Sequence, residues 1–110
     1  MIPLNQLEDM FDNMRDKTNW NVDGPMLWGY FFMDTDADKL KKAANHLVNE
    51  GYRLVDIHPA DDGEVKVLHM ERIETHSAQT LFERNKYLYG IAEQFDLELY
   101  DGMDVGPAAS

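Results

Sequence analysis

The sequence predicts an α+β domain of the ferredoxin-like, split βαβ class, preceded by an N-terminal amphipathic helix. After that helix, the hydrophobic pattern changes between helical and strand periodicity in the order β-α-β-β-α-β. The chain has 110 residues, which suits one domain, and its 44% hydrophobic and 11% aromatic residues can fill one core. We therefore expect a four-stranded antiparallel sheet with two helices on one face.

The N-terminal helix and the first strand have the clearest patterns. Apolar residues recur at helical spacing at Leu4, Leu7, Met10, Phe11 and Met14. This spacing predicts an amphipathic helix over residues 4–16. Residues 26–33 are apolar at both alternating sets of positions, which is typical of a central strand that is covered on both faces.

The strand at 26–33 presents a different set of side chains to each face of the sheet. One set is aromatic: Trp28, Tyr30 and Phe32. The other set contains Leu27, Phe31 and Met33. Because two helices cover one face only, we expect the aromatic set on the face that they do not reach. The N-terminal helix is the expected cover, and a partner or a second copy of the chain is the alternative.

The remaining elements follow from capping residues and turns. Thr35 is expected to cap a helix that ends at Gly51, with an apolar stripe of Leu40, Ala43, Ala44, Leu47 and Val48. Residues 52–58 and 65–73 predict a hairpin, Thr75 or Ser77 begins a long helix, and 97–100 form the last strand. We expect one domain over 1–102, with its core at 26–102, and a flexible tail over 103–110.

Asn85 interrupts the apolar stripe of the last helix, between Leu81 and Leu88. A buried amide must find hydrogen-bond partners, so we expect a structural bond to a neighbouring loop or strand. The alternative is an amide that faces a ligand.

The sequence contains no motif that predicts catalysis, a metal or a cofactor. There is no cysteine, Ser77 lies in no nucleophile elbow, and the four histidines lack zinc-binding spacing. The acidic run at 34–38 begins like a calcium-binding loop, but Lys39 and Asn45 replace the glycine and glutamate that such a loop needs. We expect a protein that is not an enzyme.

The chain carries 21 acidic and 10 basic residues, which gives a formal charge of −11. This charge repels nucleic acids and anionic membranes and attracts basic protein segments. Residues 65–71 also lack the aromatic pattern of RNA-recognition modules. With no apolar run of the roughly 20 residues that span a bilayer, we expect a cytoplasmic protein that binds neither nucleic acid nor membrane.

Two segments resemble a known family. Residues 88–102 run from a helix ending in Ala-Glu-Gln-Phe into a strand and the sequence Tyr-Asp-Gly, and residues 40–55 lead through Asn-Glu-Gly-Tyr into a strand. From about 26 to 102 the chain resembles the RraB-like regulators of ribonuclease E activity. Met103 departs from the family, in which an aromatic residue usually follows Tyr-Asp-Gly.

The resemblance implies a ferredoxin-like fold, no enzymatic activity and a role in regulating bacterial RNA degradation. It implies that the protein inhibits ribonuclease E by binding the C-terminal scaffold region of that enzyme. An acidic domain suits an arginine-rich segment. We predict that six carboxylates contribute to the partner-binding surface: Asp61, Asp62, Glu64, Glu98, Asp101 and Asp104.

Two other functional classes remain open. In a divergent small-molecule-binding domain, Trp28, Tyr30, Phe32 and Asn85 would line a pocket. In a self-associating interaction domain, the aromatic sheet face would pair with its twin to form a homo-oligomer.

Overall fold

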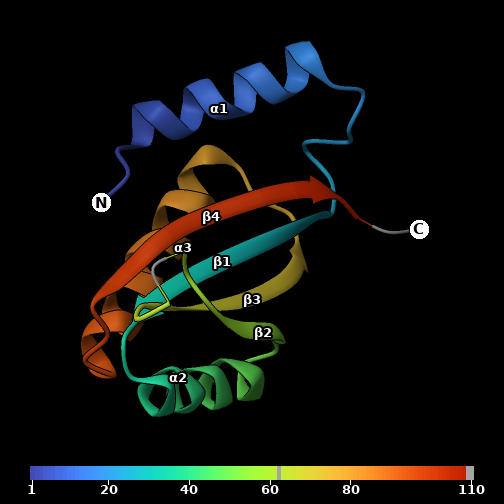
Figure 1. Ribbon diagram of the computed structural model, residues 1–110. Coiled ribbons are helices and arrows are strands. Elements are labelled where there is room, and N and C mark those ends of the chain that lie inside the picture. Colours follow the sequence, from blue (N-terminus) through green and yellow to red (C-terminus); the bar gives the residue numbers. More distant parts are fainter. Residues whose placement is uncertain (62, 109–110) are drawn as a thin grey trace.

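The computed structural model describes residues 1–61 and 63–108 as a four-stranded sheet with three helices (Figure 1). In chain order the elements are α1 (Leu4–Lys17), β1 (Met26–Asp34), α2 (Ala37–Asn49), β2 (Arg53–Pro59), β3 (Lys66–Glu74), α3 (Ala78–Gln94) and β4 (Leu99–Pro107). The strand order is β2-β3-β1-β4, and all neighbouring strands are antiparallel. This confirms the predicted ferredoxin-like class with an added N-terminal helix.

Helices α2 and α3 begin at side-chain caps. Ser77 caps α3 in a capping box, in which Ser77 and Thr80 each bond the backbone N–H of the other. The cap of α2 is Asp36, which accepts a hydrogen bond from the Asp38 N–H at 2.9 Å. The expectation that Thr35 caps this helix is therefore wrong by one residue.

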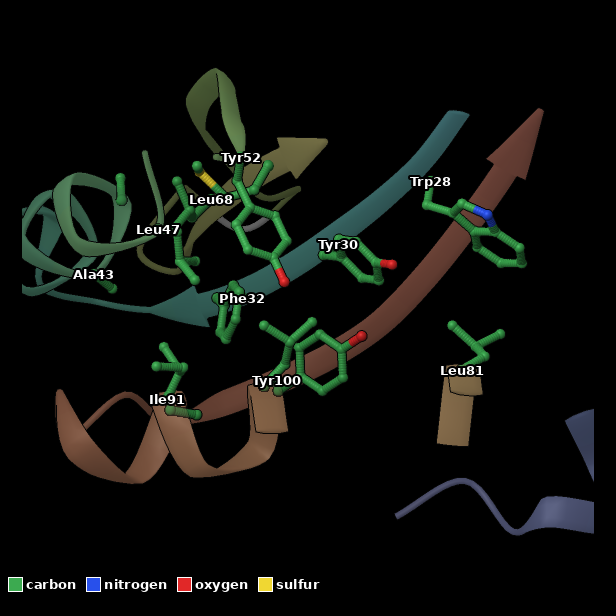
Figure 2. Close-up of a cluster of buried hydrophobic side chains, with 14 of the residues drawn as sticks. Trp28, Tyr30, Phe32, Ala43, Leu47, Tyr52, Leu68, Leu81, Ile91 and Tyr100 are labelled. Atoms are coloured by element: carbon green, nitrogen blue, oxygen red, sulfur yellow. The ribbon is translucent and has the colours of Figure 1, made fainter. Parts of the chain in front are cut away.

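The aromatic set of β1 faces the helices, which corrects the orientation expected from the sequence. Trp28, Tyr30 and Phe32 are each 0% exposed, and Figure 2 shows them on the side of β1 that faces α3. The largest apolar side chains lie where packing between the sheet and the helices removes the most area from water. They are therefore available neither as an aromatic interaction face nor as the lining of a ligand pocket.

Helix α1 adds to the same core and does not cover the opposite face. Its buried residues Leu7, Phe11 and Met14 join the cluster that contains the β1 aromatics, and the ring centroids of Phe11 and Trp28 are 5.9 Å apart. Figure 1 shows α1 and α2 at opposite ends of the molecule, with the sheet and α3 between them. The second face of the sheet is left without a helix.

The last strand is longer than predicted. Residues 103–107 continue β4 and pair with β1, so this part of the predicted tail is a strand. Residues 109–110 of the predicted tail lie outside the described residues. Asp101 and Gly102 form a bulge and not a turn, because the register shifts there and Gly102 has a φ of +113°. Met103 and Val105 then pack against the core, which explains why the strand continues.

Asn85 makes the structural hydrogen bond that the sequence predicts. It is 0% exposed, and its Oδ1 accepts a bond of 2.7 Å from the Tyr100 hydroxyl. Its Nδ2 donates to Met103 Sδ at 3.5 Å. Burial raises the pKa of Tyr100, which keeps the donating hydroxyl protonated. The amide joins α3 to β4 and does not face a ligand.

Replacing Asn85 with Ala should lower the free energy of unfolding by about 1–3 kcal/mol, because the Tyr100 hydroxyl would stay buried without its acceptor. Urea unfolding measures this change. The double variant Asn85→Leu with Tyr100→Phe removes both polar partners and should recover most of the loss. If the double variant is less stable than Asn85→Ala, the bond does not have the role assigned here.

Candidate functional site: open sheet face and acidic end

The sheet face opposite the helices is partly apolar. We call it the open face, and its central residues are Leu27, Gly29, Phe31 and Met33 of β1, Val67, His69, Glu71 and Ile73 of β3, Arg53 of β2, and Leu99 and Asp104 of β4. Ile73 is 55% exposed and Leu99 is 44% exposed. An exposed sheet face normally carries mainly polar side chains, so the open face has the composition of a contact surface.

A hollow of about 250 Å³ lies at the centre of the open face, above Gly29. We call it the Gly29 hollow. Its lining includes Leu27, His69, Glu71 and Asp104. A Cβ atom at position 29 would lie 2.3 Å from Asp104 Oδ1 and 2.9 Å from His69 Nε2, so a side chain there would collide with both. Glycine thus allows two polar side chains to lean over the central strand.

The residues around the Gly29 hollow are fixed by their neighbours. The His69 ring stacks on Phe31, with ring centroids 4.4 Å apart and an interplanar angle of 23°. Glu71 is 8% exposed and forms an ion pair with Arg53. A second hollow of about 450 Å³, which also includes Arg72 and Ile73, shares Leu27 and Glu71 with the first. The open face therefore has a hollow on each side of Glu71.

One end of the sheet collects acidic loops. The β1–α2, β2–β3 and α3–β4 connections all lie at this end, because β1 and β2 finish there and β3 and β4 begin there. We call the following residues the acidic end: Asp36, Asp61, Glu64, Asp96, Glu98 and Asp101. Lys39 pairs with Asp96 at 3.0 Å and offsets part of this charge. The fold thus gathers carboxylates that are far apart in the sequence.

Asp34 holds two loops of the acidic end together. It is 3% exposed and accepts hydrogen bonds from the Asp36 N–H at 2.7 Å and from the Glu98 N–H at 2.9 Å. The carboxylate at the end of β1 therefore fixes the start of α2 and the approach to β4. This structural role accounts for the first position of the acidic run at 34–38.

The six predicted partner-binding carboxylates do not form one group. Asp61, Glu64, Glu98 and Asp101 belong to the acidic end, and Asp62 lies outside the described residues. Asp104 pairs with Gly29, five residues from Asp34 along β1, which is a separation of about 17 Å. Asp104 is therefore part of the open face.

A hollow of about 620 Å³ lies at the corner between β3 and α3. Beside it, Glu74 accepts hydrogen bonds of 2.7 Å from the Tyr30 hydroxyl and 2.7 Å from Arg84 Nη2. His76 Nε2 lies 2.9 Å from Glu74 Oε2. The Arg84 guanidinium also lies 5.3 Å from the centre of the Tyr52 ring. The polar groups satisfy one another, which indicates a structural network.

The electrostatics of this corner favour an ionised Glu74. Burial alone would raise the pKa of Glu74, but hydrogen bonds from His76 and Tyr30 and the charges of His76 and Arg72 outweigh it and lower the pKa. For Tyr30, burial and the Glu74 carboxylate raise the pKa. Within residues 1–61 and 63–108, no group of three or more His, Asp or Glu side chains is placed to hold a metal ion.

Comparison with known families matches residues 4–105 to the RraB family, described as regulator of ribonuclease activity B. This match covers nearly the whole chain. The chain belongs to the RraB family. The resemblance seen at residues 40–55 and 88–102 is thereby confirmed, and the RraB match also includes α1, which those two segments did not reach. Comparison with curated proteins gives no significant match.

RraB membership makes this domain a regulator of ribonuclease activity. Its two candidate surfaces are the open face and the acidic end. No helix in the described part of the chain is long and apolar enough to cross a membrane.

Sequence reasoning named Asp104 but missed Gly29, His69 and Glu71, which line the Gly29 hollow with it. Gly29 lies inside an apolar run, and an isolated glycine within a strand often marks a close approach of another group. That signal was present in the sequence. Nothing local in the sequence shows that His69, Glu71 and Asp104 meet around Gly29, because this depends on strand order and register.

Replacing Glu74 with Gln should lower the free energy of unfolding near neutral pH by about 2–3 kcal/mol, because it leaves buried cationic and hydroxyl partners without their carboxylate. The pKa of Glu74 is lowered from 4.5 in the folded state, so its stabilisation is present above 4.5 and is lost as pH falls through the lowered pKa. Urea unfolding at a series of pH values should show the difference between wild type and variant shrinking in that acidic range.

The control for this experiment is Glu93→Gln, at an exposed position on α3, which should change stability little at any pH. A difference between wild type and Glu74→Gln that stays constant down to strongly acidic pH would contradict the role given to the carboxylate.

Proposed function

We propose that this RraB-family domain inhibits ribonuclease E by binding the basic C-terminal scaffold region of the enzyme, without catalytic activity of its own. The family match over residues 4–105 is the observation that carries this proposal. The net charge of −11 supports it, because a basic segment is the kind of partner that such a field attracts. Inhibition then results from occupation of the scaffold region, and the place of action is the cytoplasm.

The carboxylates of the acidic end direct this attraction toward one end of the sheet. Carboxylates from three connections converge there, and carboxylates accept paired hydrogen bonds from arginine. Charge complementarity of this kind increases the rate of encounter and weakens with salt, because mobile ions screen exposed charges beyond about 8–10 Å. We therefore propose Asp61, Glu64, Glu98 and Asp101 as contributors to partner capture, together with Asp62, which lies outside the described residues.

The other functional classes considered from the sequence lose their main support. Both needed Trp28, Tyr30 and Phe32 at an accessible surface, and these side chains are each 0% exposed. Asn85 is also fully buried and bonded. The regulatory proposal requires none of these residues to be accessible.

Titration of the domain against the ribonuclease E C-terminal region should show saturable binding that is stronger at about 50 mM than at about 150 mM salt. The double variant Asp61→Lys with Glu98→Lys should weaken binding about tenfold or more at the lower salt, because it reverses charge on two acidic loops. Isothermal titration calorimetry measures both effects.

The matched control is Asp16→Lys with Glu93→Lys, which changes the net charge equally at exposed positions on α1 and α3. It should weaken binding less. Equal losses in both double variants would mean that net charge alone acts and that the acidic end has no special role. Absence of binding at either salt would contradict the proposed partner.

The protein should slow RNA cleavage by full-length ribonuclease E and leave cleavage by a fragment without the C-terminal region unchanged. The physical reason is that binding to the scaffold region does not occupy the catalytic part. A gel-based cleavage assay with one RNA substrate compares the two enzymes. Equal inhibition of both would show that the domain acts at the catalytic part instead.

A further inference from the structure

We propose that the open face is the docking surface for an extended basic segment, and that one arginine side chain of this segment enters the Gly29 hollow. The proposal rests on the proposed function only for the basic character of the partner. It assigns the contact to residues that differ from those of the acidic end.

The first support is the row of residues that crosses the sheet at Gly29. In register across the four strands lie Arg53 of β2, Glu71 of β3, Gly29 of β1 and Asp104 of β4. The charges along this row are positive, negative, none and negative. Neighbouring strands lie about 4.8 Å apart. If the exposed Asp104 carboxylate, which leans over Gly29, turns aside, a cation at Gly29 stands between two carboxylates and continues the alternation that Arg53 begins.

The second support is the shape of this position. Gly29 has no side chain, and Asp104 Oδ1 and His69 Nε2 lean over it. The hollow beside these two side chains is also lined by Leu27, Glu71, Val105 and Gly106. Asp104 is exposed and can turn toward a guest, whereas Glu71 is 8% exposed and is held by Arg53. A planar guanidinium suits this place, because it offers hydrogen-bond donors along several edges and packs flat against a backbone or an aromatic ring.

The third support is the apolar surface on both sides of the row. Toward the end of the sheet near the start of β1, Leu27 and the 55% exposed Ile73 lie beside the hollow. In the other direction lie Phe31, with the His69 ring stacked on it, and then Met33. In an extended segment, an arginine would therefore contact the Glu71 and Asp104 carboxylates, and apolar residues on either side of that arginine would contact the apolar surface on either side of the row.

A second copy of this chain suits the face poorly. Each copy has a net charge of −11, and a symmetric pair would bring Glu71 and Asp104 of one copy toward a surface with the same two carboxylates. Like charges at a contact are costly when they are removed from water. The charge pattern therefore favours a basic occupant over self-association.

The test uses a short peptide with one central arginine between alternating leucine and serine, and a matched peptide with citrulline in place of arginine. When the full chain is titrated with the arginine peptide, the ¹⁵N–¹H NMR signals of the Gly29 amide and of other amides of the open face should shift. Citrulline keeps the shape and removes the charge, so its peptide should bind at least about tenfold more weakly. Shifts confined to the acidic end, or equal affinity for both peptides, would overturn the proposal.

The variants Asp104→Asn and Ile73→Lys should each lower the affinity for the arginine peptide several-fold, because they change exposed residues beside the hollow. The controls Asp61→Asn, in the acidic end, and Val48→Lys, at an exposed position on α2, should bind it as wild type does. Unchanged NMR spectra away from each substitution confirm that the variants are folded. Wild-type affinity in both open-face variants would overturn the proposal.

The same variants separate this proposal from the proposed function. If wild type binds the ribonuclease E C-terminal region and Asp104→Asn and Ile73→Lys bind it equally well, the docking surface is wrong and the function stands. If that region does not bind while the arginine peptide still shifts the Gly29 amide, the function is wrong and the docking surface stands.

Discussion

The burial of one face of β1 is the constraint on which the rest of the structure depends. β1 is a central strand that pairs with β3 on one side and β4 on the other. Trp28, Tyr30 and Phe32 fill the space between this strand and the helices. Because side chains on a strand alternate, this choice also decides the other face. Leu27, Gly29 and Phe31 must then point away from the helices and form the middle of the open face.

Buried polar contacts fix the parts that apolar packing leaves undetermined. Asp34 ties the start of α2 to the approach of β4, Asn85 ties α3 to β4, and Glu74 ties β3 to α3. Each of these polar side chains lies at a position where the hydrophobic pattern predicts an apolar side chain or the end of an element. Each forms hydrogen bonds with the partners described above. Such contacts stabilise one arrangement of the elements over others with similar hydrophobic burial.

The two candidate surfaces differ in physical character and suit different steps of one binding event. The acidic end consists of loops and the start of β4, with exposed carboxylates that act over distance and depend on salt. The open face combines apolar side chains with a few fixed charges, which act at contact and give specificity. In the proposed mechanism the RraB domain attracts a basic scaffold segment by the first surface and holds it by the second.

The sequence by itself determined the fold class, the order of the elements and the family. Periodicity placed the helices and the first three strands within a few residues, and the pattern around Asn85 predicted a buried hydrogen bond. The sequence did not determine which face of β1 meets the helices, since both alternating sets of β1 side chains are apolar. The length of β4 was also missed, because a bulge at Asp101 looks like a turn in the sequence.

Only the tertiary structure decided which polar residues become neighbours. Arg53, Glu71, Gly29 and Asp104 come from four strands and meet in one row, although they are spread over residues 29–104 of the 110-residue chain. Strand order and register are set by packing and pairing over the whole sheet, and a one-residue shift would move each side chain to the opposite face. Local sequence carries the residue types that a site needs, while their meeting is a property of the complete fold.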